Sequence, residues 1–261
     1  MRELLKRVII GTPAEPFARK LHGTVRRAAS AFRPMPKAQL YDIQTVEIMK
    51  RALHHDSTCV DVGCHRGEIL REMLRIAPNG THFAFEPLPM MYQGLRETFG
   101  SLTNVHLYDY ALSSSSGTAS FQHVVTNAAY SGFLQRRYPH LDEQIQEITV
   151  KTELLDNLVP RHLRVDFIKV DVEGAELRVF EGAIETIRTN RPIVVFEHGL
   201  GAADYYGTRP EDVYDLLAVR CGLKLFVMAD WLSSATKAPL RRERFCEHFS
   251  TGRDYYFMAA A

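Results

Sequence analysis

The chain has 261 residues, of which 46% are hydrophobic and 24% are charged, and its formal net charge is +1. This composition is typical of a folded globular protein and excludes a disordered chain, and the near-neutral charge argues against a general nucleic-acid binder. We therefore expect no nucleic acid among its partners. No apolar run approaches the roughly 18 residues that a membrane-spanning helix needs, so no transmembrane segment is predicted.

The first 37 residues are basic, with nine Lys or Arg residues against two acids. Such a segment is suited to peripheral contact with an anionic membrane surface or an acidic partner, but a solvated face of one or two added helices is the favoured interpretation. Pro34 and Pro36 end it, because proline resists helix. We predict a helical extension over residues 1–38 and one domain over residues 39–261.

The start of the chain lacks the long apolar region of a secretory signal, and the four cysteines form no CxxC pair. A cytoplasmic protein with reduced thiols is therefore expected. A zinc site built from the cysteines is disfavoured, because it needs tighter paired spacing. The sequence leaves the oligomeric state open, a homo-oligomer included.

The first half of the domain alternates between helical and strand patterns. Apolar spacing predicts helices over 40–53, 67–76 and 90–99, and strands over 58–62, 81–85 and 105–108. Two extra strands follow, over 118–125 and 148–152, and the polar and aromatic stretch 124–147 is interpreted as a lid or acceptor loop.

Regular alternation then resumes towards the end of the chain. Strands are predicted over 166–170, 193–197, 223–228 and 255–258, and helices over 175–187 and 211–219. This order predicts an α/β fold with a central, mostly parallel seven-stranded sheet, helices on both faces, and a β insertion after the third strand.

A glycine turn follows the first predicted strand. Asp61 ends the strand, and the turn reads Gly63-Cys64-His65-Arg66-Gly67. Glycines let a backbone pass close to a bound cofactor, and Gly67 opens a helix whose free amides favour negative charge. The GxxxG spacing differs from the GxGxxG of dinucleotide sites, and Asp61 suits the ammonium group of an amino-acid-like ligand. We assign Asp61, Gly63, His65 and Gly67 to cofactor binding.

Glu86 ends the second predicted strand, 25 residues after Asp61. That distance fits a strand, a helix and a strand, so both acids should meet at the carboxyl edge of the sheet, where such folds bind ligands. A carboxylate has two acceptor oxygens and can bind the two hydroxyls of a ribose. Asp109 follows the third strand and is either a partner for an adenine amino group or a turn residue.

Four polar residues end the two strands that follow the insertion. Lys169 should meet Asp171 or another acid, or face the pocket, because a buried unpaired lysine is costly. Asp171 is a candidate to position the cofactor, bind a hard cation or act as a base. Glu197 and His198 reach the same edge, and His198 is a candidate base, although a lone histidine after a strand is more often structural.

These segments together resemble the FkbM family of S-adenosylmethionine-dependent methyltransferases, over roughly residues 55–230. The run Lys-Val-Asp-Val-Glu-Gly-Ala-Glu at 169–176 is the most specific match. The sequence departs from the family at Ser114, where many relatives have an acid, and the basic segment 1–37 lies outside the resemblance. The matching segments occur in the family's order, at 60–67, 85–87, 111–113, 150–156, 168–176 and 194–197.

The resemblance implies a class I Rossmann-like methyltransferase fold and transfer of a methyl group to a hydroxyl of a sugar, glycan or natural product. It implies that Asp61, Gly63 and Gly67 hold the methionine part of S-adenosylmethionine, that Glu86 holds the ribose, and that Asp171 lines the reaction centre. Some related O-methyltransferases use a divalent cation such as Mg²⁺, for which Asp171 and Glu197 would be oxygen ligands. Two alternatives stay open: a nicotinamide-dependent oxidoreductase, and a non-catalytic scaffold of the same fold.

Overall fold

A computed structural model describes residues 35–138, 142–233 and 238–261. Contacts group the chain into two compact units, residues 1–40 and residues 41–261. The extension predicted over 1–38, and any membrane contact through it, lies almost wholly outside the described residues. Within the described part, no helix has both the length and the apolar character needed to cross a membrane.

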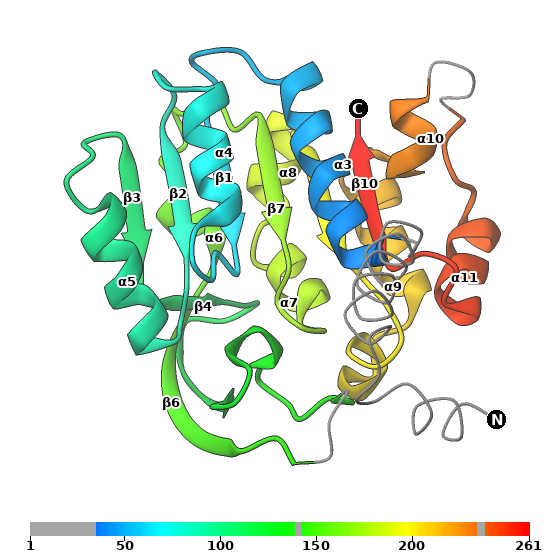
Figure 1. The fold of residues 1–261 in the computed structure, drawn as a ribbon. Helices are drawn as coiled ribbons and strands as arrows, with labels where there is room; N and C mark the ends of the chain where they lie inside the picture. The colour runs from blue at the N-terminus through cyan, green and yellow to red at the C-terminus, as the bar shows by residue number, and fades with distance from the viewer. Residues whose placement is uncertain (1–34, 139–141, 234–237) are drawn as a thin grey trace, which may run out of the picture. The chain divides into compact units, whose positions relative to one another are not determined.

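A seven-stranded sheet organises the described part of the main unit (Figure 1). Its order is β3-β2-β1-β7-β8-β10-β9, and every neighbouring pair is parallel except those that involve β10. The predicted mostly parallel sheet is therefore confirmed. The strands are β1 (Cys59–Val62), β2 (His82–Phe85), β3 (Val105–Tyr108), β7 (Phe167–Val170), β8 (Ile193–Glu197), β9 (Lys224–Val227) and β10 (Tyr256–Ala260).

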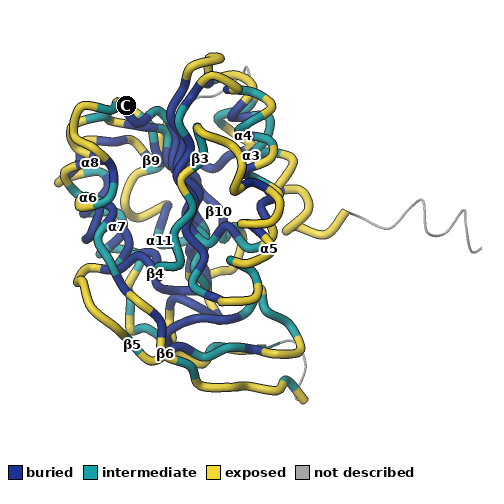
Figure 2. Tube along the Cα trace, turned by 90° about the vertical axis from the view of Figure 1, so that its left-hand side faces the viewer, coloured by how far each residue is buried: buried dark blue, intermediate teal, exposed yellow. Residues whose placement is uncertain are grey.

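Helices cover both faces of the sheet because alternate strand residues point to opposite sides. Cys59 and Phe167 pack with the helices on one face, whereas Val60 and Ile168 pack with those on the other. Figure 2 shows helices on both sides of the sheet. The first layer holds α3 (Lys37–Ala52), α4 (Glu68–Ile76), α5 (Pro89–Phe99) and α10 (Met228–Leu232). The second holds α6 (Leu155–Leu158), α7 (Glu176–Glu181), α8 (Ile184–Asn190), α9 (Pro210–Tyr214), the π-helical segment η3 (Asp215–Arg220) and α11 (Arg242–Thr251).

Two helices differ from their predictions. The helix expected over 175–187 is divided into α7 and α8, which meet at Gly182 and Ala183. A Cβ at Gly182 would lie 2.1 Å from the carbonyl oxygen of Ser113. The break between the two helices therefore leaves room for the chain at Ser113, directly after residues 110–112. The helix expected over 211–219 begins as α9 and continues with π geometry as η3. Helix α11 was not predicted.

The β insertion after the third strand is confirmed. It contains β4 (Tyr110–Leu112), β5 (Gly117–Val124), the short 3-10 helix η1 (Ala128–Tyr130) and β6 (Ile145–Glu153), with the sheet order β4-β6-β5. Phe121 and Phe133 pack with Leu88 and Ala175, which follow β2 and β7. The insertion therefore rests against the carboxyl edge of the main sheet.

Candidate functional site

A cavity of about 950 Å³ opens at the carboxyl edge of the main sheet. Its walls come from the ends of β1, β2 and β7, from α3 and α4, and from the insertion. Six of the predicted site residues line it: Asp61, Gly63, His65, Glu86, Lys169 and Asp171. The structure therefore brings these six residues together at this edge, as the sequence predicts.

The two glycines of the turn are required by contacts within the protein. Gly63 has φ 74°, and a Cβ there would lie 1.9 Å from the carbonyl oxygen of Asp171. Gly67 has φ 78°, and its Cβ would lie 2.5 Å from the ring of Phe99, away from the cavity lining. Close packing of the turn against Asp171 and α5 therefore requires both glycines, and their predicted role in cofactor binding stays a prediction.

Gly63→Ala is expected to lower the free energy of unfolding by about 3 kcal/mol or more, because it combines a left-handed backbone with overpacking. The matched control is Gly94→Ala in α5, where a Cβ meets nothing within 4 Å. That variant should gain about 0.5–1 kcal/mol, since alanine favours a helix interior. Urea unfolding measures both values, and equal stabilities of the two variants would contradict the packing argument.

Glu86 joins the ends of β1 and β2. Its Oε2 accepts a hydrogen bond from the backbone N–H of His65 at 2.8 Å, and its Oε1 accepts one from the N–H of Leu88 at 3.0 Å. The residue is 5% exposed, and burial raises the pKa of its carboxyl to about 7. Each oxygen keeps a further lone pair, so Glu86 can accept two more hydrogen bonds from a ligand.

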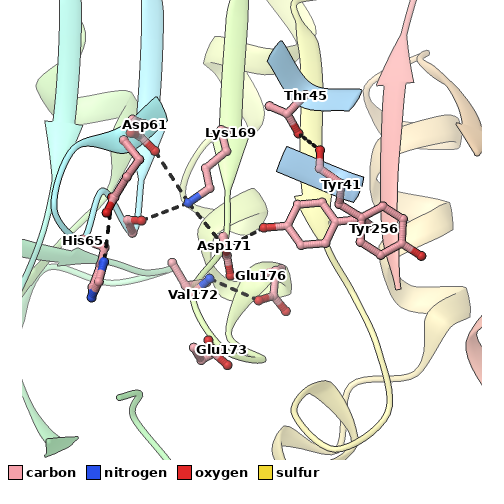
Figure 3. Close-up of polar contacts among 12 residues, drawn as sticks. Tyr41, Thr45, Asp61, His65, Lys169, Asp171, Val172, Glu173, Glu176 and Tyr256 are labelled. Atoms are coloured by element: carbon pink, nitrogen blue, oxygen red, sulfur yellow. Dashed lines mark hydrogen bonds and ion pairs between the residues drawn. The ribbon is translucent and has the colours of Figure 1, made fainter. Parts of the chain in front are cut away.

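Lys169 occupies the centre of the polar cluster (Figure 3). Its Nζ donates to the carbonyl oxygen of Gly63 at 2.9 Å and lies 3.7 Å from Asp61 Oδ1 and 3.5 Å from Asp171 Oδ2. Burial alone would lower the pKa of Lys169, but the carboxylates of Asp171 and Asp61 outweigh it and the pKa is raised. The expectation that Lys169 meets an acid is confirmed.

Asp61 borders the cavity but has no exposed surface. Burial raises the pKa of its carboxyl, and the cation of Lys169 opposes this shift. Asp61 is therefore linked to the loop through Lys169, which also donates to Gly63. Neither oxygen of the Asp61 carboxylate has a hydrogen-bond partner among the described residues, and its predicted contact with a ligand ammonium group stays a prediction.

Tyr256, from β10, holds Asp171 from the other side. Its hydroxyl donates to Asp171 Oδ2 at 2.5 Å, and its ring stacks on that of Tyr41 with centroids 5.2 Å apart (Figure 3). Burial would raise the pKa of Asp171, but Lys169 and Tyr256 more than offset it, so the pKa is lowered. Sequence reasoning missed Tyr256, because its place opposite Glu197 depends on an antiparallel register that the sequence does not reveal.

The predicted metal ligands lie together, with a third carboxylate beside them. Asp171, Glu173 and Glu197 each offer an oxygen, and these oxygens lie within 4.8 Å of one another. Burial and the charge of Asp171 raise the pKa of Glu197 far above its usual value. Glu173, however, is already paired with the guanidinium of Arg136. Carboxylates suit Mg²⁺, but an arginine that is already paired with one of them does not.

Four predicted site residues do not line the cavity: Gly67, Asp109, Glu197 and His198. His198 is completely buried on the opposite face of the sheet from Glu197, where it stacks on Phe249 with ring centroids 4.8 Å apart. The expectation that both residues reach one site fails because consecutive strand residues face opposite sides. Asp109 is paired with Lys151 of β6 at 2.9 Å, so its neighbour Tyr110 lines the cavity instead.

His198 makes the stability of the protein sensitive to acid. Burial lowers its pKa to about 3 from the usual 6.5. Below pH 6.5 the unfolded chain binds a proton that the folded protein does not, so stability falls by about 1.4 kcal/mol per pH unit as the pH drops towards 3. His198→Phe should remove that much slope between about pH 4 and 6. Urea unfolding at several pH values measures it, and parallel curves for the two proteins would contradict this account.

The strand order, with antiparallel β10 between β8 and β9, is that of the class I Rossmann-like methyltransferase fold. The chain belongs to the family described as the methyltransferase FkbM domain, whose sequence model matches residues 61–225. This match confirms the resemblance inferred from the sequence. It begins within β1 and includes β2 and β7, and so covers Glu86, Lys169 and Asp171.

Among characterised proteins, the chain is similar to the 2-O-methyltransferase NoeI of Sinorhizobium fredii (strain NBRC 101917 / NGR234). The two are 27% identical over 183 residues, which are 66% of this chain and 74% of NoeI. A structure of methyltransferase FkbM from Methylobacillus flagellatus KT is similar with a TM-score of 0.49 and 15% identity, over 80% of this chain and 44% of that one. The precorrin-6y C5,15-methyltransferase of Geobacter metallireducens GS-15 is similar with a TM-score of 0.44 and 13% identity, over 84% and 87% of the two chains.

Proposed function

We propose that this methyltransferase moves the methyl group of S-adenosylmethionine to a hydroxyl oxygen of a sugar, glycan or natural-product acceptor. The observation that carries the proposal is the buried carboxylate of Glu86 at the cavity, in a chain that belongs to a methyltransferase family. The name of the relative NoeI, a 2-O-methyltransferase, supports oxygen as the acceptor atom.

Glu86 would bind the ribose hydroxyls of the cofactor. Its carboxylate is held by two backbone amides, so it is already oriented before the ligand arrives. A bound hydroxyl would then meet a fixed acceptor, and little ordering would be required on binding. His65 lines the same part of the cavity, and the backbone of Gly63 borders it.

S-adenosylmethionine supplies an activated methyl group on a sulfonium leaving group. The residues of the chain must therefore align the acceptor oxygen and receive its proton. Asp171 lines the cavity and is fixed by Lys169 and Tyr256, so we assign it to accept the hydrogen bond from the acceptor hydroxyl. His198 takes no part in this proposal because it lies across the sheet.

Asp171→Asn is expected to lower turnover by about 10²–10⁴-fold, the usual contribution of a positioned acid or base. Affinity for S-adenosylmethionine should change little, because Glu86 is untouched. Single-turnover rates and calorimetry separate these two effects. Full turnover by the variant would contradict the role of Asp171.

The reaction itself is tested by incubating the protein with methyl-labelled S-adenosylmethionine and panels of hydroxylated acceptors and cell extracts. Label should enter an acceptor hydroxyl. Donor binding without incorporation into any acceptor would contradict turnover and favour a non-catalytic scaffold. A parallel incubation in strong chelator tests whether the reaction requires Mg²⁺. We expect activity to persist in the chelator, because Arg136 is already paired with Glu173 of the carboxylate group.

A further inference from the structure

We propose that Arg136 is a built-in cation, which gives the carboxylate cluster of Asp171, Glu173 and Glu197 the positive charge that a divalent metal ion would otherwise give it. This inference goes beyond the proposed reaction, because it concerns how the acceptor side of the cavity is neutralised and held together. It assigns a role to a residue of the insertion that sequence analysis placed only within a lid or acceptor loop.

The cluster needs a counter-charge. Three carboxyl groups, one oxygen from each, lie within 4.8 Å of one another, and like charges this close repel each other unless a cation lies nearby. Lys169 supplies positive charge to Asp171, and it also lies close to Asp61. Glu173 lies beyond that lysine and projects from a backbone with φ 58°, a conformation that is unfavourable for a residue other than glycine.

Arg136 provides that counter-charge from the insertion. Its side chain is only 12% exposed, and it forms an ion pair with Glu173, which is 14% exposed. The guanidinium also lies over the ring of Tyr130, 5.2 Å from its centroid.

The backbone around Arg136 is fixed independently of this charge. The N–H of Arg137 donates to the carbonyl oxygen of Gly201 at 3.0 Å, and the N–H of Leu134 donates to the hydroxyl of Tyr206 at 3.0 Å. Both partners follow β8, Tyr206 within the short helix η2 (Ala203–Tyr206). The guanidinium is therefore delivered to the cluster by a segment that is already anchored, which lowers the entropic cost of the ion pair.

The guanidinium of Arg136 and a divalent cation cannot both bind to this carboxylate cluster. The metal would need several carboxylate oxygens at once, whereas Arg136 keeps one of the three carboxylates and repels a second cation. The protein should consequently not bind divalent metal at this cluster, and loss of the Arg136 charge should convert the cluster into a metal site.

The test is a Mn²⁺ titration of the full-length protein, followed by electron paramagnetic resonance, with neither methyl donor nor acceptor present. The natural protein should leave Mn²⁺ free up to about 1 mM, whereas Arg136→Gln should bind one Mn²⁺ with a Kd on the order of 10⁻⁴ M, within the range of carboxylate sites. Adding Glu173→Gln to that variant should remove the new site. Arg137→Gln, which alters the exposed neighbour, is the matched control and should behave like the natural protein.

Two results would overturn the proposal. One is binding of a single Mn²⁺ by the natural protein at micromolar concentration and its loss in Glu173→Gln, a measurement that depends on no arginine variant. The other is an Arg136→Gln protein that is folded by circular dichroism but binds no Mn²⁺. Because the titration contains no methyl donor or acceptor, its outcome is independent of whether the proposed methyl transfer is correct.

Discussion

Replacing Glu86 by Gln is expected to weaken binding of S-adenosylmethionine by about 100-fold or more, since the loss of a buried acceptor costs about 1–3 kcal/mol for each group left unpaired. The carboxylate accepts from the N–H groups of His65 and Leu88, and an amide can accept at only one of its two heavy atoms. The variant therefore loses one acceptor atom, together with the negative charge that strengthens each hydrogen bond from a ribose hydroxyl. Calorimetry with the purified protein measures the affinity.

The matched control is Glu97→Gln on α5, whose exposed side chain accepts a hydrogen bond from Gln93. It removes the same charge from the surface of the same domain and should leave affinity for the cofactor unchanged. If Glu86→Gln bound the cofactor as tightly as this control, Glu86 would not be a ligand of the ribose.

Lys169→Met is expected to lower the free energy of unfolding by about 3–5 kcal/mol, the usual cost of removing one partner from a buried ion pair. Asp61 and Asp171 would lose their common cation, and the carbonyl oxygen of Gly63 would lose its donor. The loop after β1 and the end of β7 should therefore loosen together. Urea unfolding gives the free energy directly.

Lys151→Met serves as the control for this variant. Lys151 pairs with Asp109 at 2.9 Å, but the lysine side chain is 57% exposed, so its loss should cost much less than the loss of Lys169. Adding Asp61→Asn to Lys169→Met should restore part of the lost stability, because it removes one uncompensated charge. Equal costs for the two lysine variants would contradict the central place of Lys169.

The sheet could be predicted from the sequence because its strands are short apolar runs that end in polar residues. Asp61 lies next to the last residue of β1, and Glu86 and Asp171 directly follow β2 and β7, so parallel topology alone predicts that they meet at one edge. The break between α7 and α8 could not be predicted, because it depends on the approach of Ser113 to Gly182. Such contacts between distant segments leave no local pattern.

The site residues that sequence reasoning missed likewise depend on contacts between distant segments of the chain. Arg136 and Tyr256 belong to segments whose position depends on the insertion and on an antiparallel register. His198 was misplaced for a different reason. Alternation along β8 turns it away from Glu197, and the aromatic rings that enclose it come from α11, about fifty residues later.

The most direct test of the central claim is calorimetric titration of the full-length protein with S-adenosylmethionine, S-adenosylhomocysteine and NAD⁺. The account predicts one site for each of the first two ligands, in competition with one another, and no binding of NAD⁺. Binding of NAD⁺ at the cavity, or no heat with either adenosyl compound, would contradict it.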